Sequence, residues 1–331
     1  MNNLSIDWSH GRASVQSLGA MLAPADFALP DGRWVSPLHT APWVFEALSE
    51  NTPAILQALR GEWPCVPFGA ADVSTLSERW RLHDAQAEPE PHGHAANSHW
   101  QLQRINNETV KTTIQYPEHH AIQSLERHIR ATPGTAELAL ELTVNSRLDT
   151  RIPIGLHPVF KLPEQPETLQ LIPDHVDQVW TYPGDTGGPT LFMPDAQCNT
   201  LSAVPGVKGS DINATCLPFK GSSENLLLLT GTNGRFDLLH RSERYRVVLR
   251  WDAEHFPSVL LWISNKGRQD KPWSGRHLAL GVEPVCAAFD LGTDISAGNN
   301  PLAQQGIKTA LALKACHPWT TRYSIAVESA V

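Results

Sequence analysis

Two ionisable side chains lie in apolar segments, and a proline follows each of them. His157 stands in IGLHPVFKL (154–162) and Glu283 in LALGVEPVCAAFD (278–290). The proline fixes the local backbone, and an imidazole held in place is a good general acid near neutral pH. A carboxylate is costly to bury without partners, and burial alone raises its pKa. The structural alternatives are a core histidine bonded to a carbonyl and a strand-end glutamate paired with an arginine.

Two earlier segments add further polar candidates. Arg60 opens the proline-rich turn RGEWPCVPFG, which could hold a guanidinium towards a ligand, although most arginines are simply exposed. His92, His94 and His99 fall within EPHGHAANSHW. The HxH spacing suits a metal on a strand, but no third ligand follows at a typical spacing, and exposed turn histidines are the alternative. Gly93 beside His92 would permit close approach by a ligand.

Together these residues suit proton transfer on a sugar. A histidine that donates a proton and a glutamate that accepts one can move a proton across a sugar hemiacetal without metal or nucleotide. The sequence has no GxGxxG and no GxxxxGK[ST] phosphate loop, so no dinucleotide or ATP is expected. We therefore predict a site that needs no cofactor.

The sequence predicts that the elements which position these residues are mainly antiparallel strands. Alternating apolar and polar residues predict strands over Trp100–Ile105, Thr109–Tyr116, Glu137–Val144, Tyr245–Trp251 and Ser258–Ser264. Pro42–Arg60 is the best helical segment, although Pro53 splits it. Between Pro163 and Ser223 the pattern loosens, which indicates long loops with short strands that could cover a binding face.

Composition limits the class of protein. The chain has 331 residues, 41% of them hydrophobic and 18% charged, which excludes a disordered chain and favours one large β domain over residues 1–331. A net charge of −8 argues against nucleic acid, and the apolar runs are too short to span a membrane. Five cysteines without paired spacing and no signal-like N-terminus predict reduced, buried thiols in the cytoplasm.

Four motifs, in order along most of the chain, resemble the aldose 1-epimerase (galactose mutarotase-like) superfamily, and most of all its hexose-phosphate mutarotase branch. They are Arg60–Gly69, with Glu62 in place of a glycine, His92–Ala96 followed by Trp100, His157–Phe160 and Val282–Val285. Each motif alone is weak, and together they are fairly specific.

The resemblance implies an all-β fold, a galactose mutarotase-like β-supersandwich of large antiparallel sheets. It implies that Glu283 takes the anomeric proton, that His157 protonates the ring oxygen, and that His92 steadies the sugar. Opposite charges would favour each other, so we expect an ionised Glu283 and a protonated His157. Arg60, His92, His157 and Glu283 should line one open cleft.

Two departures from the family pattern bear on the substrate. The arginine that helps hold phosphate in the branch is Ala96 here, and a methyl group cannot replace it, so a phosphorylated sugar is not expected even though Arg60 remains. The family aspartate that binds sugar hydroxyls corresponds by context to Glu224 in SSENLLLL, with Asp211 and Asp237 as rivals.

The sequence thus predicts an isomerase that interconverts the anomers of a free aldose, as a monomer or homodimer whose partner is a small-molecule sugar. A non-catalytic carbohydrate-binding protein on the same fold is one alternative, because fold does not fix function. A metal-dependent sugar isomerase that uses His92, His94 and a distant ligand is another.

Overall fold

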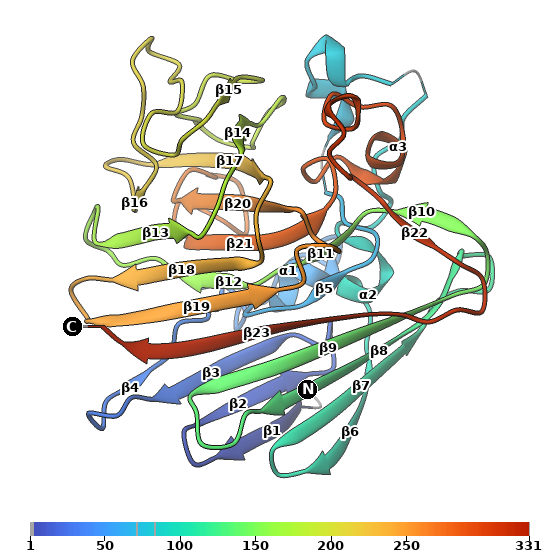
Figure 1. Ribbon diagram of the computed structural model, residues 1–331, viewed down its shortest axis with the longest axis vertical. Helices are drawn as coiled ribbons and strands as arrows, with labels where there is room; N and C mark the ends of the chain where they lie inside the picture. The colour runs from blue at the N-terminus through green and yellow to red at the C-terminus, as the bar shows by residue number, and fades with distance from the viewer. Residues whose placement is uncertain (1–2, 71, 83, 331) are drawn as a thin grey trace.

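The computed structural model describes residues 3–70, 72–82 and 84–330, and two large antiparallel sheets dominate it (Figure 1). The nine-stranded sheet has the order β16-β13-β18-β19-β23-β9-β8-β7-β6. Its strands are β6 (Gln101–Asn106), β7 (Thr109–Gln115), β8 (Ile122–Ala131), β9 (Glu137–Ser146), β13 (Leu169–Pro173), β16 (Cys216–Leu217), β18 (Arg235–His240), β19 (Tyr245–Trp251) and β23 (Trp319–Ser329).

The second sheet has eight strands in the order β15-β14-β17-β20-β21-β11-β5, and β12 also pairs with β21. Its strands are β5 (Pro64–Cys65), β11 (Ile154–Leu156), β12 (Val159–Lys161), β14 (Gln178–Thr181), β15 (Gln197–Cys198), β17 (Ser223–Thr230), β20 (Ser258–Asn265) and β21 (Leu278–Cys286). All pairings between these strands are antiparallel, so the all-β supersandwich prediction is confirmed.

Smaller elements complete the chain. A four-stranded sheet and a two-stranded ribbon lie beside the large sheets. They contain β1 (Asn3–Trp8), β2 (Gly11–Gln16), β3 (Leu22–Ala28) and β4 (Trp34–Val35), and β10 (Thr150–Ile152) with β22 (Leu311–Leu313). The helices are short: α1 (Ala54–Ala58), α2 (Gly93–Asn97), α3 (Gly292–Ala297) and the 3-10 turns η1 (Val73–Thr75), η2 (Glu78–Trp80) and η3 (Ala303–Gln305).

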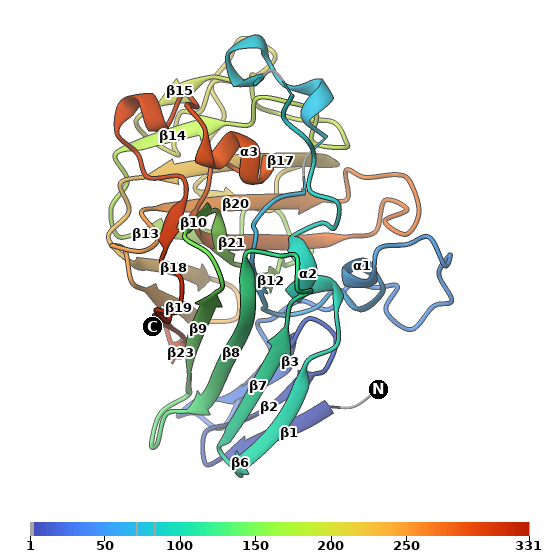
Figure 2. The same ribbon diagram turned by 90° about the vertical axis from the view of Figure 1, so that its right-hand side faces the viewer.

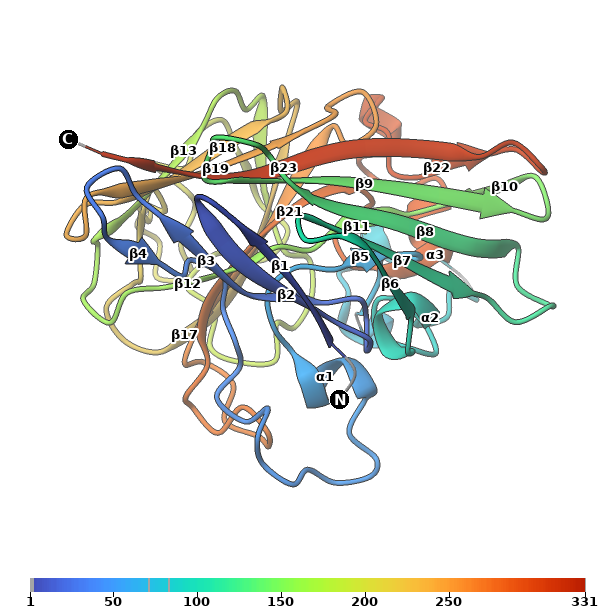
Figure 3. The same ribbon diagram turned by 90° about the horizontal axis from the view of Figure 1, so that it is seen from below.

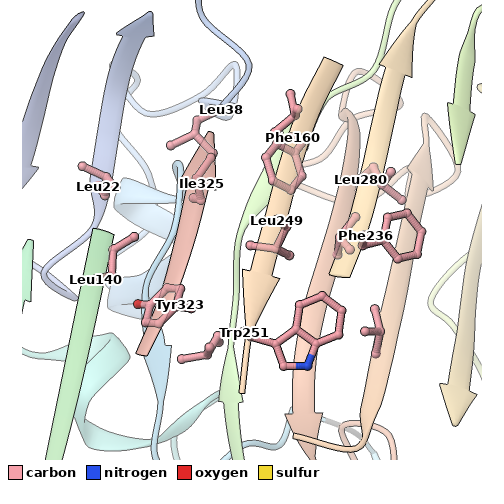
Figure 4. Packing of buried hydrophobic residues seen from close by; sticks show 14 of the residues in the cluster. Leu22, Leu38, Leu140, Phe160, Phe236, Leu249, Trp251, Leu280, Tyr323 and Ile325 are labelled. Carbon is pink, nitrogen blue, oxygen red and sulfur yellow. The ribbon is translucent and has the colours of Figure 1, made fainter. Parts of the chain in front are cut away.

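The central strands of the eight-stranded sheet are buried on both faces. Along β17, Leu227 and Leu229 join the core that packs against the nine-stranded sheet, whereas Leu226 and Leu228 join a second, tryptophan-rich cluster on the opposite face. Figure 4 shows part of the first core, to which Leu249 of β19 and Leu280 of β21 both belong. Polar side chains on the second face are therefore held in an apolar setting.

The structure confirms the five predicted strands to within two residues at each end, and it confirms the short strands in long loops between 163 and 223. The helix prediction over Pro42–Arg60 is wrong except at α1. Pro53 precedes the first helical residue, and the segment before it forms turns. The cysteines are free, but only Cys65 and Cys286 are buried, so the expectation of buried thiols is wrong for the other three.

Two loops protrude on the same side of the molecule. Figures 2 and 3 show the segment before α1 and the connection between β20 and β21 extending outward together. Arg276 of the second loop donates to both oxygens of Glu46 in the first, at 2.5 and 2.7 Å, and the rings of Trp43 and Trp273 meet edge to face at 4.7 Å. These contacts fix the loops against each other beside the tryptophan-rich face.

Candidate active site

A cavity of about 230 Å³ opens on the tryptophan-rich face of the eight-stranded sheet, and we call it the central cavity. It is lined by Ile55, Leu56, Leu59, Trp63, Ala70, Pro91, His92, His157, Leu226, Leu260, Trp262, Arg268, Trp273, Glu283 and Asp290. The structure thus brings together three of the predicted site residues, His92, His157 and Glu283, from distant parts of the sequence.

The strand register carries Glu283 into the cavity. Glu283 of β21 pairs with Leu260 of β20, which pairs with Leu228 of β17, so the three side chains form one row on the tryptophan-rich face. The next residue of β21 on this face is Gly281. A Cβ atom there would lie 2.1 Å from Oε1 of Glu283, so the glycine leaves the space that the carboxyl group occupies.

His157 lies in the link between β11 and β12, directly before Pro158. Its backbone N–H donates to the Trp63 carbonyl at 2.9 Å, and its ring stacks on the Trp63 indole at 4.2 Å between centroids. Nε2 is 3.4 Å from Oε1 of Glu283, and both side chains are at most 4% exposed. Backbone and ring contacts together therefore aim the imidazole at the carboxyl group.

Burial shifts the pKa of both groups of this pair. Desolvation raises the pKa of Glu283 well above its usual value, and the nearby Asp290 raises it further. Desolvation lowers the pKa of His157 well below its usual value, and His92 lowers it further. Both shifts run against the expectation of an ionised Glu283 and a protonated His157, because desolvation disfavours the charged form of each group, and the expected ionisation stays a prediction.

His92 meets His157 edge to face at 4.9 Å, and desolvation lowers its pKa to about 3. It has a left-handed backbone with φ of +60°, and it precedes α2. The space left by Gly93 is filled by Val66 and Pro67, so the expected ligand approach at this glycine is wrong. His94 instead lies beside Tyr116, at 5.0 Å between ring centroids, and is not among the residues that line the cavity.

Arg60 is not among the residues that line the central cavity, so the expectation that it joins the cleft is wrong. Its Nε donates to the Ala58 carbonyl at 2.9 Å, and the Gln16 amide oxygen accepts from the guanidinium in the orientation that satisfies both groups. Its Cζ atom lies 5.9 Å from the ring of Phe45. Local contacts thus hold this side chain outside the cavity.

Glu224 lies at the start of β17 with its side chain fully buried, behind the cavity wall. Burial raises the pKa of this carboxyl group, although Arg268, Trp262 and Ser264 oppose the shift. Of its rivals, Asp237 belongs to β18 in the other sheet and pairs with Arg235 at 2.8 Å, and Asp211 is exposed. Glu224 is therefore the one of the three that lies next to the site.

Sequence reasoning missed two charged residues of the cavity, Arg268 and Asp290. Arg268 belongs to the loop after β20, in a segment without periodic pattern. Asp290 follows β21, and desolvation raises the pKa of its carboxyl group, although the side chain of Tyr182 opposes the shift. Asp290 could have been found, since it ends the apolar segment that holds Glu283, whereas nothing in the sequence distinguishes Arg268.

Ala96, which stands where the phosphate-binding branch has an arginine, is fully buried in α2. The cavity has a guanidinium nevertheless, because Arg268 supplies one from a different element. Discrimination against sugar phosphates therefore stays a prediction, and it cannot rest on the absence of a cation.

Among the described residues, no three His, Cys, Asp or Glu side chains gather in a way that could hold a metal ion. His92 and His94 face different surroundings, so the two do not form the HxH ligand pair of the metal-dependent alternative. None of the helices in the described part of the chain is long and apolar enough to cross a membrane.

Comparison with known proteins gives the fold. No protein-family model matches the chain, and no curated protein matches its sequence. Among solved structures, a protein of Escherichia coli K12 provisionally assigned as an aldose 1-epimerase aligns with a TM-score of 0.67 at 14% identity, over 99% of both chains. An aldose epimerase homologue from C. elegans aligns with a TM-score of 0.63 at 14% identity, over 100% of this chain and 99% of its own.

A galactose mutarotase-like protein from Lactobacillus casei aligns with a TM-score of 0.62 at 14% identity, over 99% of this chain and 100% of its own. The chain therefore has the galactose mutarotase-like fold over its whole length. These similarities do not single out the hexose-phosphate branch.

Proposed function

We propose that this protein is an aldose 1-epimerase that interconverts the α and β anomers of a free aldose. One observation carries the proposal: Nε2 of His157 lies 3.4 Å from Oε1 of Glu283, and both side chains line the central cavity. Oε1 of Glu283 and Nδ1 of His157 are buried and have no hydrogen-bond partner among the described residues. Such unpaired polar atoms are costly, and a sugar with its hydroxyl groups would pair with them.

The reaction needs one group that gives a proton and one that takes a proton. As the ring opens, the anomeric hydroxyl loses its proton, the bond between C1 and the ring oxygen breaks, and the ring oxygen gains a proton. C1 becomes an aldehyde, the C1–C2 bond rotates, and closure reverses both transfers on the other face. Each transfer is general acid–base catalysis by a positioned side chain.

The His157–Glu283 pair meets this need when it holds one proton in total. An ionised Glu283 with a protonated His157 has the same number of protons as a protonated Glu283 with a neutral His157. Burial of both groups favours the second, uncharged distribution, so Glu283 donates to the ring oxygen and His157 accepts the anomeric proton during opening. On closure each group reverses its own transfer: Glu283 takes the proton from the hydroxyl that re-forms the ring, and His157 returns a proton to the oxygen on C1. This assignment differs from the one that the family pattern implies, in which Glu283 takes the anomeric proton and His157 protonates the ring oxygen.

The rest of the cavity suits a single sugar ring. Its volume of about 230 Å³ is below the ~300–1,000 Å³ of pockets for drug-sized ligands. Trp63, Trp262 and Trp273 provide apolar surfaces for the C–H faces of a sugar. The neutral His92 offers a ring nitrogen, Nδ1, which has no partner among the described residues, to a hydroxyl group.

Anomerisation can be measured by polarimetry, or by NMR exchange between anomers, on a panel of free aldoses. We expect rates above the spontaneous reaction for at least one of them, unchanged by a chelator. Glu283→Gln and His157→Asn should each lower kcat by about 100-fold or more, because general acid–base groups supply 10²–10⁴-fold.

Two residues that the family pattern assigns to sugar binding, Glu224 and Arg60, do not line the central cavity. Their positions favour a second candidate function, a carbohydrate-binding protein without activity. Tight sugar binding by calorimetry, without turnover of any aldose, would establish that alternative and refute the epimerase proposal.

A further inference from the structure

The carboxylate that the family pattern assigns to sugar hydroxyls is closed off in this protein. Oε1 of Glu224 accepts from Nε1 of Trp262 at 2.6 Å, and Oε2 accepts from Oγ of Ser264 at 3.0 Å. Ser264 in turn contacts Nδ1 of His277 at 2.8 Å. Because the Glu224 side chain is fully buried and both oxygens are occupied, it cannot accept hydrogen bonds from a sugar in the cavity.

Arg268 stands between Glu224 and the cavity. Its Nε lies 3.1 Å from Oε1 of Glu224 in an ion pair, and its Nη2 donates to the Thr186 carbonyl at 3.1 Å. Its Cζ atom lies 4.8 Å from the ring centroid of Trp273 and 5.7 Å from that of Trp262. These four contacts hold the guanidinium in one place, as a binding group requires.

The remaining nitrogen of this guanidinium is available to a ligand. Nη1 of Arg268 makes no hydrogen bond within the part of the chain that the structure describes, and Arg268 lines the central cavity. The side chain is 28% exposed, whereas that of Glu224 is fully buried. What this wall offers a sugar is therefore a charged donor and not a charged acceptor.

We propose that Arg268 binds hydroxyl oxygens of the substrate and determines which sugars are accepted, and that Glu224 is a positioning residue behind it. The identity of the ligand as a sugar rests on the proposed function. A carboxylate recognises a hydroxyl group through its hydrogen, whereas a guanidinium recognises it through its oxygen. Arg268 thus donates a hydrogen bond to a sugar hydroxyl group, whereas the acidic residue of the family pattern would accept one.

This difference can be measured with substrate analogues. A deoxyfluoro sugar keeps a weak acceptor at one carbon but has no donor there, whereas a deoxy sugar has neither. At the position that faces Arg268, affinity should fall in the order hydroxyl, fluoro, deoxy. A charge-assisted hydrogen bond is worth about 10- to 100-fold in affinity, which sets the expected span between parent and deoxy sugar.

The experiment uses calorimetry on Glu283→Gln, which retains the cavity but turns substrate over slowly. The best aldose is compared with its deoxy and deoxyfluoro analogues at each carbon other than C1. Arg268→Met is then added to this background, and parent, fluoro and deoxy sugars should bind equally at the sensitive position. Arg276→Met is the matched control, since Arg276 belongs to the same loop but pairs with Glu46 away from the cavity lining, and it should preserve the discrimination.

Glu224→Gln tests the positioning role. Without the ion pair, the analogue order should weaken while hydroxyl remains preferred, because Arg268 is still present but less well held. Discrimination that survives intact in Arg268→Met, or deoxyfluoro sugars that bind no better than deoxy sugars at every carbon, would overturn the inference. If Arg268→Met does not fold, the analogue series on Glu283→Gln decides alone.

The proposed function fails separately from this inference. Turnover that is unaffected by Arg268→Met would leave the epimerase proposal in place and remove the role of Arg268. Binding with the expected analogue order, but without turnover by the wild-type protein, would uphold Arg268 and remove the epimerase.

Discussion

Replacing Gly281 by alanine should displace the carboxyl group of Glu283 with almost no other change in composition. The added Cβ would lie 2.1 Å from Oε1 of Glu283, whereas ordinary contact begins at 3.4 Å, so the carboxyl group must move by the difference, 1.3 Å. The Cβ atom of Trp262, 3.1 Å from the new methyl group, blocks one direction of relief. Because a misplacement of about 1 Å can cost about 100-fold, we expect kcat to fall by about that factor.

Polarimetry on the best aldose measures this loss, and thermal unfolding checks that the protein remains folded. The carboxyl group can swing into the central cavity, so the loss of stability should be modest. Gly306→Ala is the control: its φ of +80° strains an alanine, but no atom lies within 4 Å of the added methyl group. It should lower stability and leave kcat unchanged. If a folded Gly281→Ala variant has a normal kcat, then activity does not require the space that Gly281 leaves for the carboxyl group of Glu283.

Three further predictions follow from charge and burial. The plot of reaction rate against pH should be bell-shaped. Activity is lost at low pH when His157, whose pKa is lowered, gains a proton, and at high pH when Glu283, whose pKa is raised, loses its proton. The residual activity of Glu283→Gln should therefore lack the alkaline limb. Glu62→Gln should cost about 3–5 kcal/mol in urea unfolding, because it leaves the buried Arg127 without its ion pair, and adding Arg127→Met should recover part of the loss. Glucose 6-phosphate should bind no more tightly than glucose in a calorimetric comparison, because Glu224 and Thr186 already engage Nε and Nη2 of Arg268, and tighter binding would refute this prediction.

The strands could be predicted because their signal is local. Glu137–Val144 alternates in burial as its sequence alternates, and the structure forms β9 over Glu137–Ser146. The helix predicted over Pro42–Arg60 does not form before α1, because other contacts hold that segment in turns. Nε1 of Trp43 donates to the Leu56 carbonyl within the segment, and Glu46 pairs with Arg276 of the distant loop after β20. Tertiary contacts replaced the helix that the local pattern favoured.

The same distinction separates the site residues. His157 and Glu283 stand in apolar segments with a proline beside them, and that local signal marked them as candidates, whereas the family resemblance predicted that they share the cavity in which the structure places them. Arg60 has a similar setting in the sequence, but the Ala58 carbonyl and Gln16 hold its guanidinium elsewhere. Arg268 has no signal at all, since only the pairing of β17 with β20 brings the loop after β20 to Glu224.

Glu62 shows how one substitution can change its role. It replaces a glycine of the family pattern and lies two residues after Arg60. Its carboxylate is fully buried, where Arg127 and the hydroxyl of Tyr323 donate to it from the nine-stranded sheet. This buried ion pair links the turn before β5 to that sheet, and the same turn supplies Trp63, on which His157 stacks. Glu62 therefore supports the site through the fold, and the polar contacts with the substrate are left to residues of the cavity wall such as Arg268.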